Sequence, residues 1–308
     1  MKQQHLSFFL VLCLLSASAT VGAGVQPVQR TAAGHLVTEV TLQGSERVLF
    51  NVDTGAGATA VYEHARKRMR LAREPGARIE MQGAAGTQEI ERYRLPLLSV
   101  AGVEARNLLV SGLPAGISHG DEVMGILGRD VLSKHVVEFD LVQDRLGLHA
   151  PGTRPSSVHG WHRIPFRLRP DIGLIELTVE LGGAKVRSVL DTGARKSFVN
   201  WHAARAAGIS PQSPGLVRSS ASGGATAHAF SFDIASFPDV EIGGTRLRRP
   251  LLSIADLPAF AALHMDNRPA MIVGLDLIGD RRFVVDYPNG QLMIERLPAA
   301  PASTKRPR

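Results

Sequence analysis

The stretch Val48–Ala58, Val-Leu-Phe-Asn-Val-Asp-Thr-Gly-Ala-Gly-Ala, decides the fold when it is set against Val186–Arg195, Val-Arg-Ser-Val-Leu-Asp-Thr-Gly-Ala-Arg. Each stretch is a run of β-favouring residues that stops at Asp-Thr-Gly-Ala, and each follows a glycine-containing turn and a basic residue. Asp53 and Asp191 are 138 positions apart (191 − 53). The sequence therefore consists of two similar halves, each with one such aspartate.

Further landmarks repeat at matching distances from the two aspartates. Thr59 and Ser197 both fall six positions after the aspartate, and Ile126-Leu-Gly128 corresponds to Ile272-Val-Gly274. The aspartate and that glycine are 75 positions apart in the first half (128 − 53) and 83 in the second (274 − 191). Because solenoid repeats span only roughly 20–50 residues, this repeat indicates a whole domain that was duplicated.

The composition is typical of a globular protein rich in strands and turns. The chain has 308 residues, of which 44% are hydrophobic and 20% charged, so it is long enough for two domains with a buried core. Its 31 glycines and 18 prolines separate many short apolar runs, which favours strands over long helices. The net charge of +7 comes from scattered basic residues without an aromatic-interleaved patch. This pattern favours a solvated basic surface and no nucleic-acid partner.

Residues 1–23 have the pattern of a secretory signal peptide. Lys2 precedes the apolar segment Leu6–Leu15, and small residues at 17–19 and 21–23 offer cleavage sites. We therefore expect a periplasmic or secreted protein; the alternative is a membrane-anchored one, if the segment is retained. Cys13 is the only cysteine of the sequence. Its removal with the signal peptide would exclude thiol catalysis and cysteine-based metal sites.

Five segments follow from these boundaries and from composition. We expect a signal peptide over 1–23, an N-terminal lobe over 24–150, a Pro/Gly/Ser-rich linker over 151–160, a C-terminal lobe over 161–298 and a disordered basic tail over 299–308.

Each half is predicted to begin with a hairpin that delivers its aspartate at the end of a strand. These hairpins are Val37–Leu42 with Arg47–Val52, and Leu174–Leu181 with Lys185–Leu190. A helix is predicted after each Asp-Thr-Gly loop, over Thr59–Arg73 and over Ser197–Ala207, ended by Pro75-Gly76 and by Gly208. Val25–Arg30 is expected to be a polar lead-in. The further predicted strands are Arg78–Met81, Thr87–Tyr93, Leu95–Val100, Asn107–Val110, Val123–Leu127, Val136–Asp140, Arg145–His149, Phe230–Ile234, Val240–Ile242, Met271–Val273, Phe283–Asp286 and Gln291–Glu295.

The paired loops point to acid–base chemistry. A single Asp-Thr-Gly is more often an ordinary turn, but two loops that meet at a pseudo-twofold axis would bring Asp53 and Asp191 into hydrogen-bond contact. Two carboxyl groups within hydrogen-bond distance of each other cannot both ionise, so the pair would share one proton. The ionised member can activate water while the protonated member donates to the scissile carbonyl, which hydrolyses a peptide bond without a metal or cofactor.

Two motifs carry a family resemblance. Asp53-Thr-Gly-Ala56 and Asp191-Thr-Gly-Ala194 resemble the active-site motif of retropepsin-like aspartic proteases, and Ile126–Leu132 and Ile272–Ile278 resemble the second signature of that family. The resemblance covers residues 35–297, and with its signal sequence the chain is similar overall to bacterial exported aspartyl proteases. It implies a mainly β fold in which two homologous barrel lobes form a pseudo-dimer as in pepsin, each with a short helix after its Asp-Thr-Gly loop.

The resemblance also implies roles for residues. It implies an aspartic endopeptidase that acts as a monomer on a polypeptide substrate, with Asp53 and Asp191 as the catalytic dyad. The supporting loop residues would be Thr54, Gly55, Thr192 and Gly193. The flaps over the substrate would contain Gly83, Ala84, Ala85, Gly86, Ser222, Gly223 and Gly224. The alternative is a non-catalytic peptide-binding or sensor module that keeps the fold.

The chain departs from the pepsin pattern beside the dyad. Ala56 and Ala194 stand where pepsin-like enzymes have Ser or Thr, and the lost hydroxyl bond should leave the carboxyl pKa values higher. We therefore expect activity at mildly acidic to neutral pH. Arg195 either faces the cleft and favours acidic or C-terminal groups on the substrate, or it is a solvated surface residue. His64 and His202 are interpreted as helix-surface histidines and not as metal ligands.

Overall fold

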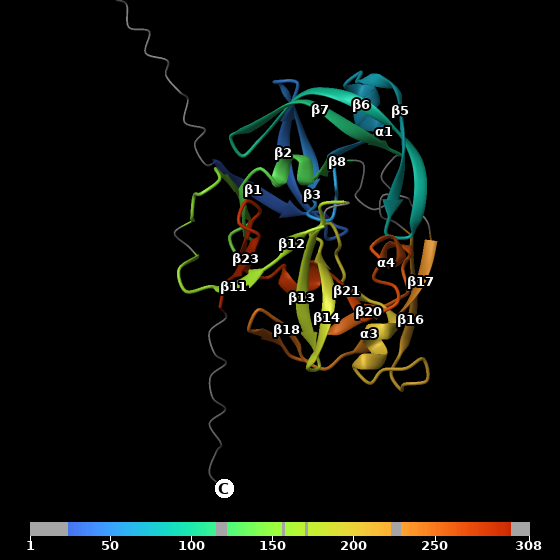
Figure 1. Cartoon of the computed structure of the whole chain (residues 1–308). Helices are drawn as coiled ribbons and strands as arrows, with labels where there is room; N and C mark the ends of the chain where they lie inside the picture. The colour runs from blue at the N-terminus through green and yellow to red at the C-terminus, as the bar shows by residue number, and fades with distance from the viewer. Residues whose placement is uncertain (1–23, 115–121, 156–157, 170–171, 223–228, 297–308) are drawn as a thin grey trace, which may run out of the picture.

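The computed structural model describes residues 24–114, 122–155, 158–169, 172–222 and 229–296. The predicted signal peptide 1–23, the tail 299–308 and two flap residues, Gly223 and Gly224, lie outside these ranges. Figure 1 shows two lobes, one above the other, built mainly from strands with a few short helices. This architecture confirms the predicted fold class.

The elements follow one another in nearly the same order in both halves. The first half contains β1 Gly24–Arg30, β2 Leu36–Leu42, β3 Glu46–Val52, β4 Ala60–Tyr62, α1 Glu63–Arg68, β5 Ala72–Gly83, β6 Gly86–Val100, β7 Val103–Leu113, β8 Val123–Leu127, α2 Arg129–Leu132, β9 Val136–Asp140 and β10 Arg145–His149. The second half contains β11 His162–Pro165, β12 Arg167–Leu168, β13 Ile175–Leu181, β14 Ala184–Leu190, β15 Phe198–Val199, α3 Trp201–Ala206, β16 Val217–Ser222, β17 Ala229–Ser236, β18 Val240–Ile242, β19 Thr245–Leu247, β20 Leu251–Ile254, α4 Pro258–Ala262, β21 Ala270–Val273, α5 Leu275–Ile278, β22 Arg282–Asp286 and β23 Gln291–Ile294.

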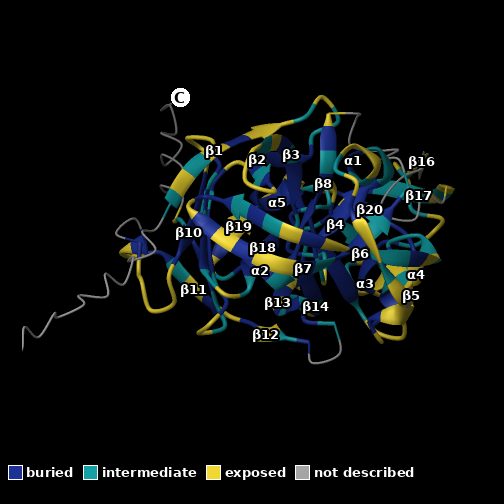
Figure 2. Ribbon diagram, turned by 90° about the horizontal axis from the view of Figure 1, so that it is seen from above, coloured by how far each residue is buried: buried dark blue, intermediate teal, exposed yellow. Residues whose placement is uncertain are grey.

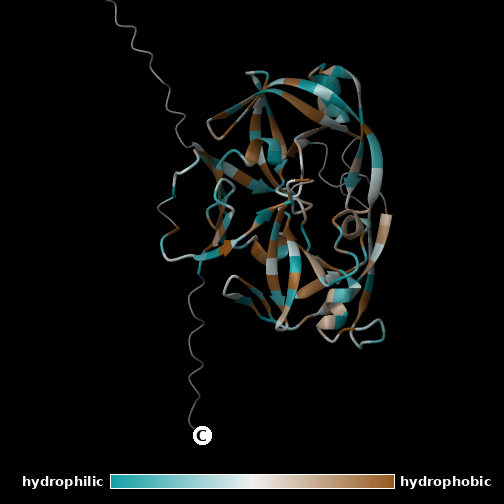
Figure 3. Cartoon of the chain, in the orientation of Figure 1, coloured by the Kyte–Doolittle hydropathy of each residue, from teal (hydrophilic) through white to brown (hydrophobic). Residues whose placement is uncertain are grey.

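The N-terminal lobe is a closed barrel of six strands in the order β2-β3-β8-β4-β7-β6. The long strand β6 closes the barrel by pairing with β2, where Thr41 lies opposite Ser99 and Leu42 opposite Leu98. Hydrophobic and hydrophilic residues alternate along many of these strands (Figure 3), because successive side chains of a strand point to opposite faces. The apolar face of each strand fills the barrel interior.

The C-terminal lobe repeats this plan. Its strand order β14-β21-β15-β20-β17-β16 corresponds to β3-β8-β4-β7-β6-β5, and β14 pairs with β21 in parallel as β3 does with β8. The strand that corresponds to β6 is interrupted at Pro238, which has no N–H to donate to a ladder. It continues as β18, which pairs with β13 at Glu180 and Leu181.

The two lobes share one sheet, formed by strands from both ends of the repeat. β22 of the second half pairs antiparallel with β9 of the first, and β1, β10, β11 and β23 extend the sheet on either side. Three of these strands, β1, β11 and β23, are labelled at the left of Figure 1. At its centre Phe139 lies opposite Phe283, and their fully buried rings stack with centroids 4.5 Å apart. The main hydrophobic core contains residues of both halves, so the buried interior runs through the whole molecule (Figure 2).

The predicted linker packs against this shared sheet. Val158 is buried, and it forms a cluster with Trp161, Val136, Val284 and Met293. Among the residues described, no helix has the length and apolar character needed to cross a bilayer.

The structure corrects both helix predictions. The helix expected over Thr59–Arg73 occupies only Glu63–Arg68, because Ala60–Tyr62 forms β4, which pairs with β7 and β8. Hydrogen bonds to two neighbouring strands outweigh the helical spacing of apolar residues there. In the second half the helix likewise begins at Trp201, after the short strand β15.

Two further segments were predicted wrongly. Val25–Arg30, expected as a lead-in, belongs to strand β1, which pairs first with β10 and then with β2. Pro75-Gly76, expected to end a helix, lies inside β5 at a shift of register between Arg73 and Arg78. Gly76 has a φ of +71° there, a conformation that glycine adopts without strain.

Candidate active site

The two aspartates stand at the ends of equivalent strands, β3 and β14. The backbone N–H of Asp53 donates to the carbonyl of Leu127 at 3.1 Å, and that of Asp191 donates to Val273 at 3.0 Å. The accepting residues end β8 and β21, which run parallel to the aspartate strands. Each aspartate is thus fixed by the strand that carries the second signature of its lobe.

Two threonines join the aspartate loops across the lobe interface. The N–H of Thr54 donates to the hydroxyl of Thr192 and the N–H of Thr192 to the hydroxyl of Thr54, each at 3.0 Å. The hydroxyl of Thr54 donates onward to the carbonyl of Leu190 at 3.0 Å, and that of Thr192 to Val52 at 2.7 Å. All four bonds are buried, so this reciprocal set holds the loops in one relative position.

Two glycines let the loops approach each other. A Cβ atom on Gly55 would lie 2.5 Å from Cγ of Asp191, and one on Gly193 would lie 2.3 Å from Cγ of Asp53. Each carboxyl therefore rests on the backbone of the opposite loop, where no larger residue fits. This contact places both carboxyls at the interface between the lobes.

The carboxyls accept hydrogen bonds from their own loops. Oδ1 of Asp53 accepts from the N–H of Gly55 at 2.8 Å. Oδ1 of Asp191 accepts from the N–H groups of Gly193 at 2.9 Å and Ala194 at 3.0 Å. The two carboxyls are also hydrogen-bonded to one another. Both aspartates remain partly accessible to solvent, so water can reach them.

Burial raises the pKa of both carboxyls. Burial and then the negative charge of Asp191 hold the pKa of Asp53 well above its ordinary value. Burial also raises the pKa of Asp191, but the hydrogen bond from Asp53 and the N–H groups of Ala194 and Gly193 offset part of that rise. The pair thus favours a singly protonated state, in which the two carboxyls share one proton and one charge.

Sequence reasoning missed two carboxylates beneath the loops. Oδ1 of Asp130 accepts from the N–H of Thr59 at 2.8 Å and from its hydroxyl at 2.6 Å. Oδ1 of Asp276 binds Ser197 in the same way, at 2.9 and 2.6 Å. Both carboxylates follow the repeated glycine by two positions (130 − 128 and 276 − 274). That spacing, together with the equivalence of Thr59 and Ser197, is the signal that could have found them.

The first predicted flap is the β5–β6 hairpin. Gly83 ends β5 and Gly86 begins β6, and the side-chain amide of Gln82 donates to the carbonyls of both, at 2.6 and 3.2 Å. The carbonyl of Ala84 at the tip accepts from the N–H of Ala259 in the opposite lobe at 3.3 Å. Figure 1 shows β5 reaching from the N-terminal lobe to α4. The first N–H groups of a helix have no partner within it, and the flap tip supplies one.

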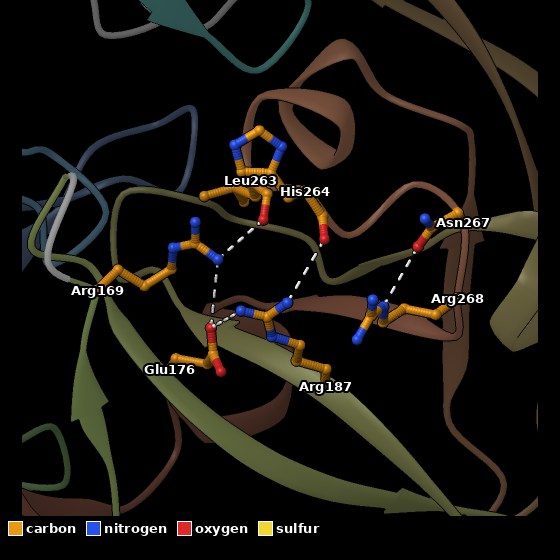
Figure 4. A network of polar contacts seen from close by, with 7 residues as sticks. All are labelled: Arg169, Glu176, Arg187, Leu263, His264, Asn267 and Arg268. Carbon is orange, nitrogen blue, oxygen red and sulfur yellow. Dashed lines mark hydrogen bonds and ion pairs between the residues drawn. The ribbon is translucent and has the colours of Figure 1, made fainter.

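Two arginines hold the other end of α4 (Figure 4). Arg169 donates to the carbonyl of Leu263 at 2.9 Å and Arg187 to that of His264 at 3.4 Å. Glu176 accepts from Arg169 at 3.5 Å and from Arg187 at 2.5 Å, which joins the two arginines. Helix C-terminal carbonyls favour such donors, so α4 is tied to its own lobe at one end and to the flap at the other.

The remaining predicted flap and its neighbours are only partly described. Ala85 lies with Ala84 at the tip of the first flap, and Ser222 ends strand β16 of the second. The expected flap residues Gly223 and Gly224 lie outside the described residues. The structure therefore brings the dyad, the two threonines, the loop glycines and one flap into one region.

The other residues singled out from the sequence differ in burial and in their contacts. Arg195 is exposed, and its Nη1 donates to the carbonyl of Ala33 in the N-terminal lobe at 2.7 Å, so it ties the Asp191 loop to the opposite lobe. His64 is partly buried with Nε2 3.1 Å from the carbonyl of Val123, whereas His202 is exposed. Within the described ranges, no group of three or more His, Cys, Asp or Glu side chains is placed to hold a metal ion.

Comparison with known proteins agrees with this geometry. A family model described as aspartyl protease matches residues 38–131 and 177–277, which together make up more than half of the chain. Each matched region contains one Asp-Thr-Gly loop and all but the last residue of one second signature. No curated protein matches the chain. With one family match in each lobe, the chain belongs to the aspartyl protease family.

Proposed function

We propose that the chain is an aspartic endopeptidase that hydrolyses peptide bonds of polypeptide substrates with a water molecule activated between Asp53 and Asp191. The observation that carries this proposal is the carboxyl pair itself. One carboxyl comes from each lobe, the two share a hydrogen bond, and burial raises the pKa of both. Such a pair holds one proton over a wide pH range, which is the state that acid–base hydrolysis needs.

The proposed steps balance within the pair. The Asp191 carboxylate takes a proton from water as the water oxygen attacks the carbonyl carbon, and Asp53 donates its proton to the carbonyl oxygen. The resulting tetrahedral diol then breaks its C–N bond. Asp191 returns its proton to the departing nitrogen while a diol hydroxyl returns a proton to Asp53. The pair ends in its starting state, and no metal or cofactor takes part in these steps.

The substrate class follows from the surroundings of the pair. The β5–β6 hairpin, whose Met81 packs on the same apolar cluster as Ala56 of the Asp53 loop, can bind an extended segment through strand-like backbone hydrogen bonds, which recognise polypeptides in general. Because one chain supplies both aspartates, we propose that a monomer is active. The predicted signal peptide supports a periplasmic or secreted site of action.

Cleavage of an unstructured protein by purified residues 24–308 between pH 3 and 8 tests the proposal. We expect Asp53→Asn and Asp191→Asn each to abolish cleavage, and Asp266→Asn, an exposed aspartate after α4, to leave it unchanged. Because burial raises both pKa values, the rate should be greatest above pH 4. Loss with only one of the dyad variants would refute the shared mechanism. A folded wild-type protein that binds peptides and cleaves none would be a binding module instead.

A further inference from the structure

Each lobe has a small apolar cluster beside its aspartate. In the N-terminal lobe this cluster contains Ile126 and packs against Ala56, and in the C-terminal lobe it contains Ile272 and packs against Ala194. The isoleucines are equivalent residues of the second signature, and each alanine follows its aspartate by three positions. The two clusters therefore occupy equivalent places on either side of the dyad.

The sheet registers show that the two clusters differ in chemistry. Ala60 and Phe198 are equivalent, because both lie seven positions after the aspartate and pair in parallel with Ser111 and Ser253. A buried alanine in one lobe therefore corresponds to a partly exposed phenylalanine in the other.

The two lobes also differ in strands β6 and β17, which pair with the strands that carry these serines. Ser111 pairs with Arg92 on β6, and Ser253 pairs with Ile234 on β17, so Arg92 and Ile234 are equivalent. The residues two and four positions before Arg92 on β6 are therefore equivalent to those two and four positions before Ile234 on β17. The equivalent positions are Phe198 with Ala60, Phe232 with Ile90, and Phe230 with Gln88.

The three phenylalanines form one aromatic surface, here called the aromatic wall. The ring of Phe198 lies edge-on to Phe230 and Phe232, with centroids 5.8 and 5.5 Å away, and the latter two rings are 5.9 Å apart. Phe230 and Phe232 are two positions apart on β17 and so share a face of the strand. Leu257, which precedes α4, and Phe260 within α4 are buried in the cluster against which the wall packs.

The aromatic wall is only partly buried, and it lies on the same side of the molecule's aspartate pair as the Asp191 loop. All three rings are partly accessible to solvent, and they pack on the same cluster as Ala194. Exposed apolar surface is unfavourable in water, and aromatic rings add edge-to-face attraction for a further ring. A large apolar side chain of a bound polypeptide would cover this surface.

We propose that Phe198, Phe230 and Phe232 determine specificity by binding a large apolar side chain, preferably an aromatic one, on the substrate residue that lies on the Asp191 side of the scissile bond. The proposal rests on the proposed peptidase function. The residue on the Asp53 side meets a surface without this trio of rings, where Leu49, Ala56 and Met81 are the partly buried apolar residues. The enzyme would therefore distinguish the two sides of the bond.

Four peptides that differ only at the scissile bond test the proposal. They carry Phe-Phe, Phe-Ala, Ala-Phe or Ala-Ala at that bond and are compared by kcat/KM with the wild type, Phe230→Ala, Phe232→Ala and Phe230→Leu. We expect the wild type to prefer Phe on one side by about tenfold or more, as apolar pockets discriminate by roughly 10–200-fold. Each alanine variant should lose most of that preference, Phe230→Leu should keep part of it, and Ala-Ala cleavage should change little. The matched control is Leu251→Ala, an exposed apolar residue on β20 outside the aromatic wall.

The outcomes separate this proposal from the proposed function. Two outcomes would refute the role proposed for the aromatic wall but not the proposed peptidase activity. One is cleavage that does not depend on which side carries Phe, and the other is an equal loss of kcat/KM for all four peptides in variants with unchanged thermal midpoints. If the wild type cleaves nothing, the proposed function fails, and binding of the same labelled peptides is measured by fluorescence anisotropy. Selective binding of one Phe-containing arrangement that is lost in Phe230→Ala would still support the aromatic wall, and equal or absent binding would refute it.

Discussion

At the residue scale, the raised pKa values of the two carboxyls lower the free energy of unfolding at neutral pH. The folded protein raises the pKa of both Asp53 and Asp191, mainly through burial. A carboxyl with a raised pKa contributes stability that is complete below its unfolded value of about 3.9, and this stability is lost as the pH rises through the folded pKa. Each unit of the rise corresponds to about 1.4 kcal/mol.

The first prediction follows from that sign. Asp191→Asn cannot ionise, whereas the wild-type carboxyl has a raised pKa in the folded state. The free energy of unfolding of the variant, relative to that of the wild type, should therefore be higher at pH 7 than at pH 4. Thermal denaturation followed by circular dichroism at the two pH values measures the difference. A wild-type advantage that grows toward pH 7 would contradict the prediction.

The second prediction concerns the threonine brace. Thr54→Val removes a hydroxyl that accepts from the N–H of Thr192 and donates to the carbonyl of Leu190. Each buried group left without a partner costs about 1–3 kcal/mol. Chemical denaturation should show a loss of that order, and Thr54→Ser, which keeps the hydroxyl, should recover most of it. Equal losses for both variants would contradict the prediction, because Thr54→Ser keeps the hydroxyl bonds that Thr54→Val removes.

At the element scale, the hydrogen bond between the first flap and α4 joins the two lobes. The third prediction is that Ala84→Cys with Ala259→Cys forms a disulfide, because the backbone N–H and carbonyl of these residues are 3.3 Å apart and such contacts leave Cα atoms within the roughly 4–7 Å that a disulfide spans. Cys13, the only native cysteine, lies in the predicted signal peptide and would not compete.

The crosslink should prevent the flap from opening. Oxidation of the double variant should stop peptide cleavage, and a reductant should restore it, with thiol titration reporting closure independently of activity. Ala84→Cys alone is the control and should be insensitive to oxidant. Full activity in the oxidised, thiol-free double variant would show that substrates enter by another path.

At the scale of the whole molecule, the shared sheet makes the two lobes one folding unit. The fourth prediction is that Phe139→Ala destabilises the protein by about 3–5 kcal/mol, because its ring is fully buried against Phe283 at the centre of that sheet. Calorimetry should show a single transition for wild type and variant. In a double-mutant cycle Phe139→Ala and Phe283→Ala should be non-additive, whereas Phe139→Ala and Phe237→Ala, a buried ring of the C-terminal lobe, should be nearly additive. Two separate transitions in the wild type would contradict a shared core.

The sequence by itself determined the duplication, the mainly β fold and the placement of Asp53 and Asp191 at strand ends. These features are written in patterns a few residues long: strand alternation, glycine turns and a repeated motif with its spacing. Such signals depend on local backbone preference and on which face of a strand is apolar. For the same reason the hairpins before both aspartates were predicted nearly to the residue.

Only the tertiary structure decided which distant segments meet. The apolar spacing over Thr59–Arg73 predicts one helix, but part of this segment forms β4 because it pairs with β7 and β8. Likewise, Val25–Arg30 forms a strand because β10 and β2 lie beside it. The bond from Arg195 to Ala33 and the docking of the flap on α4 join residues more than 160 positions apart (195 − 33 and 259 − 84). Local preferences carry no information about such partners, since these contacts form only when both lobes have packed.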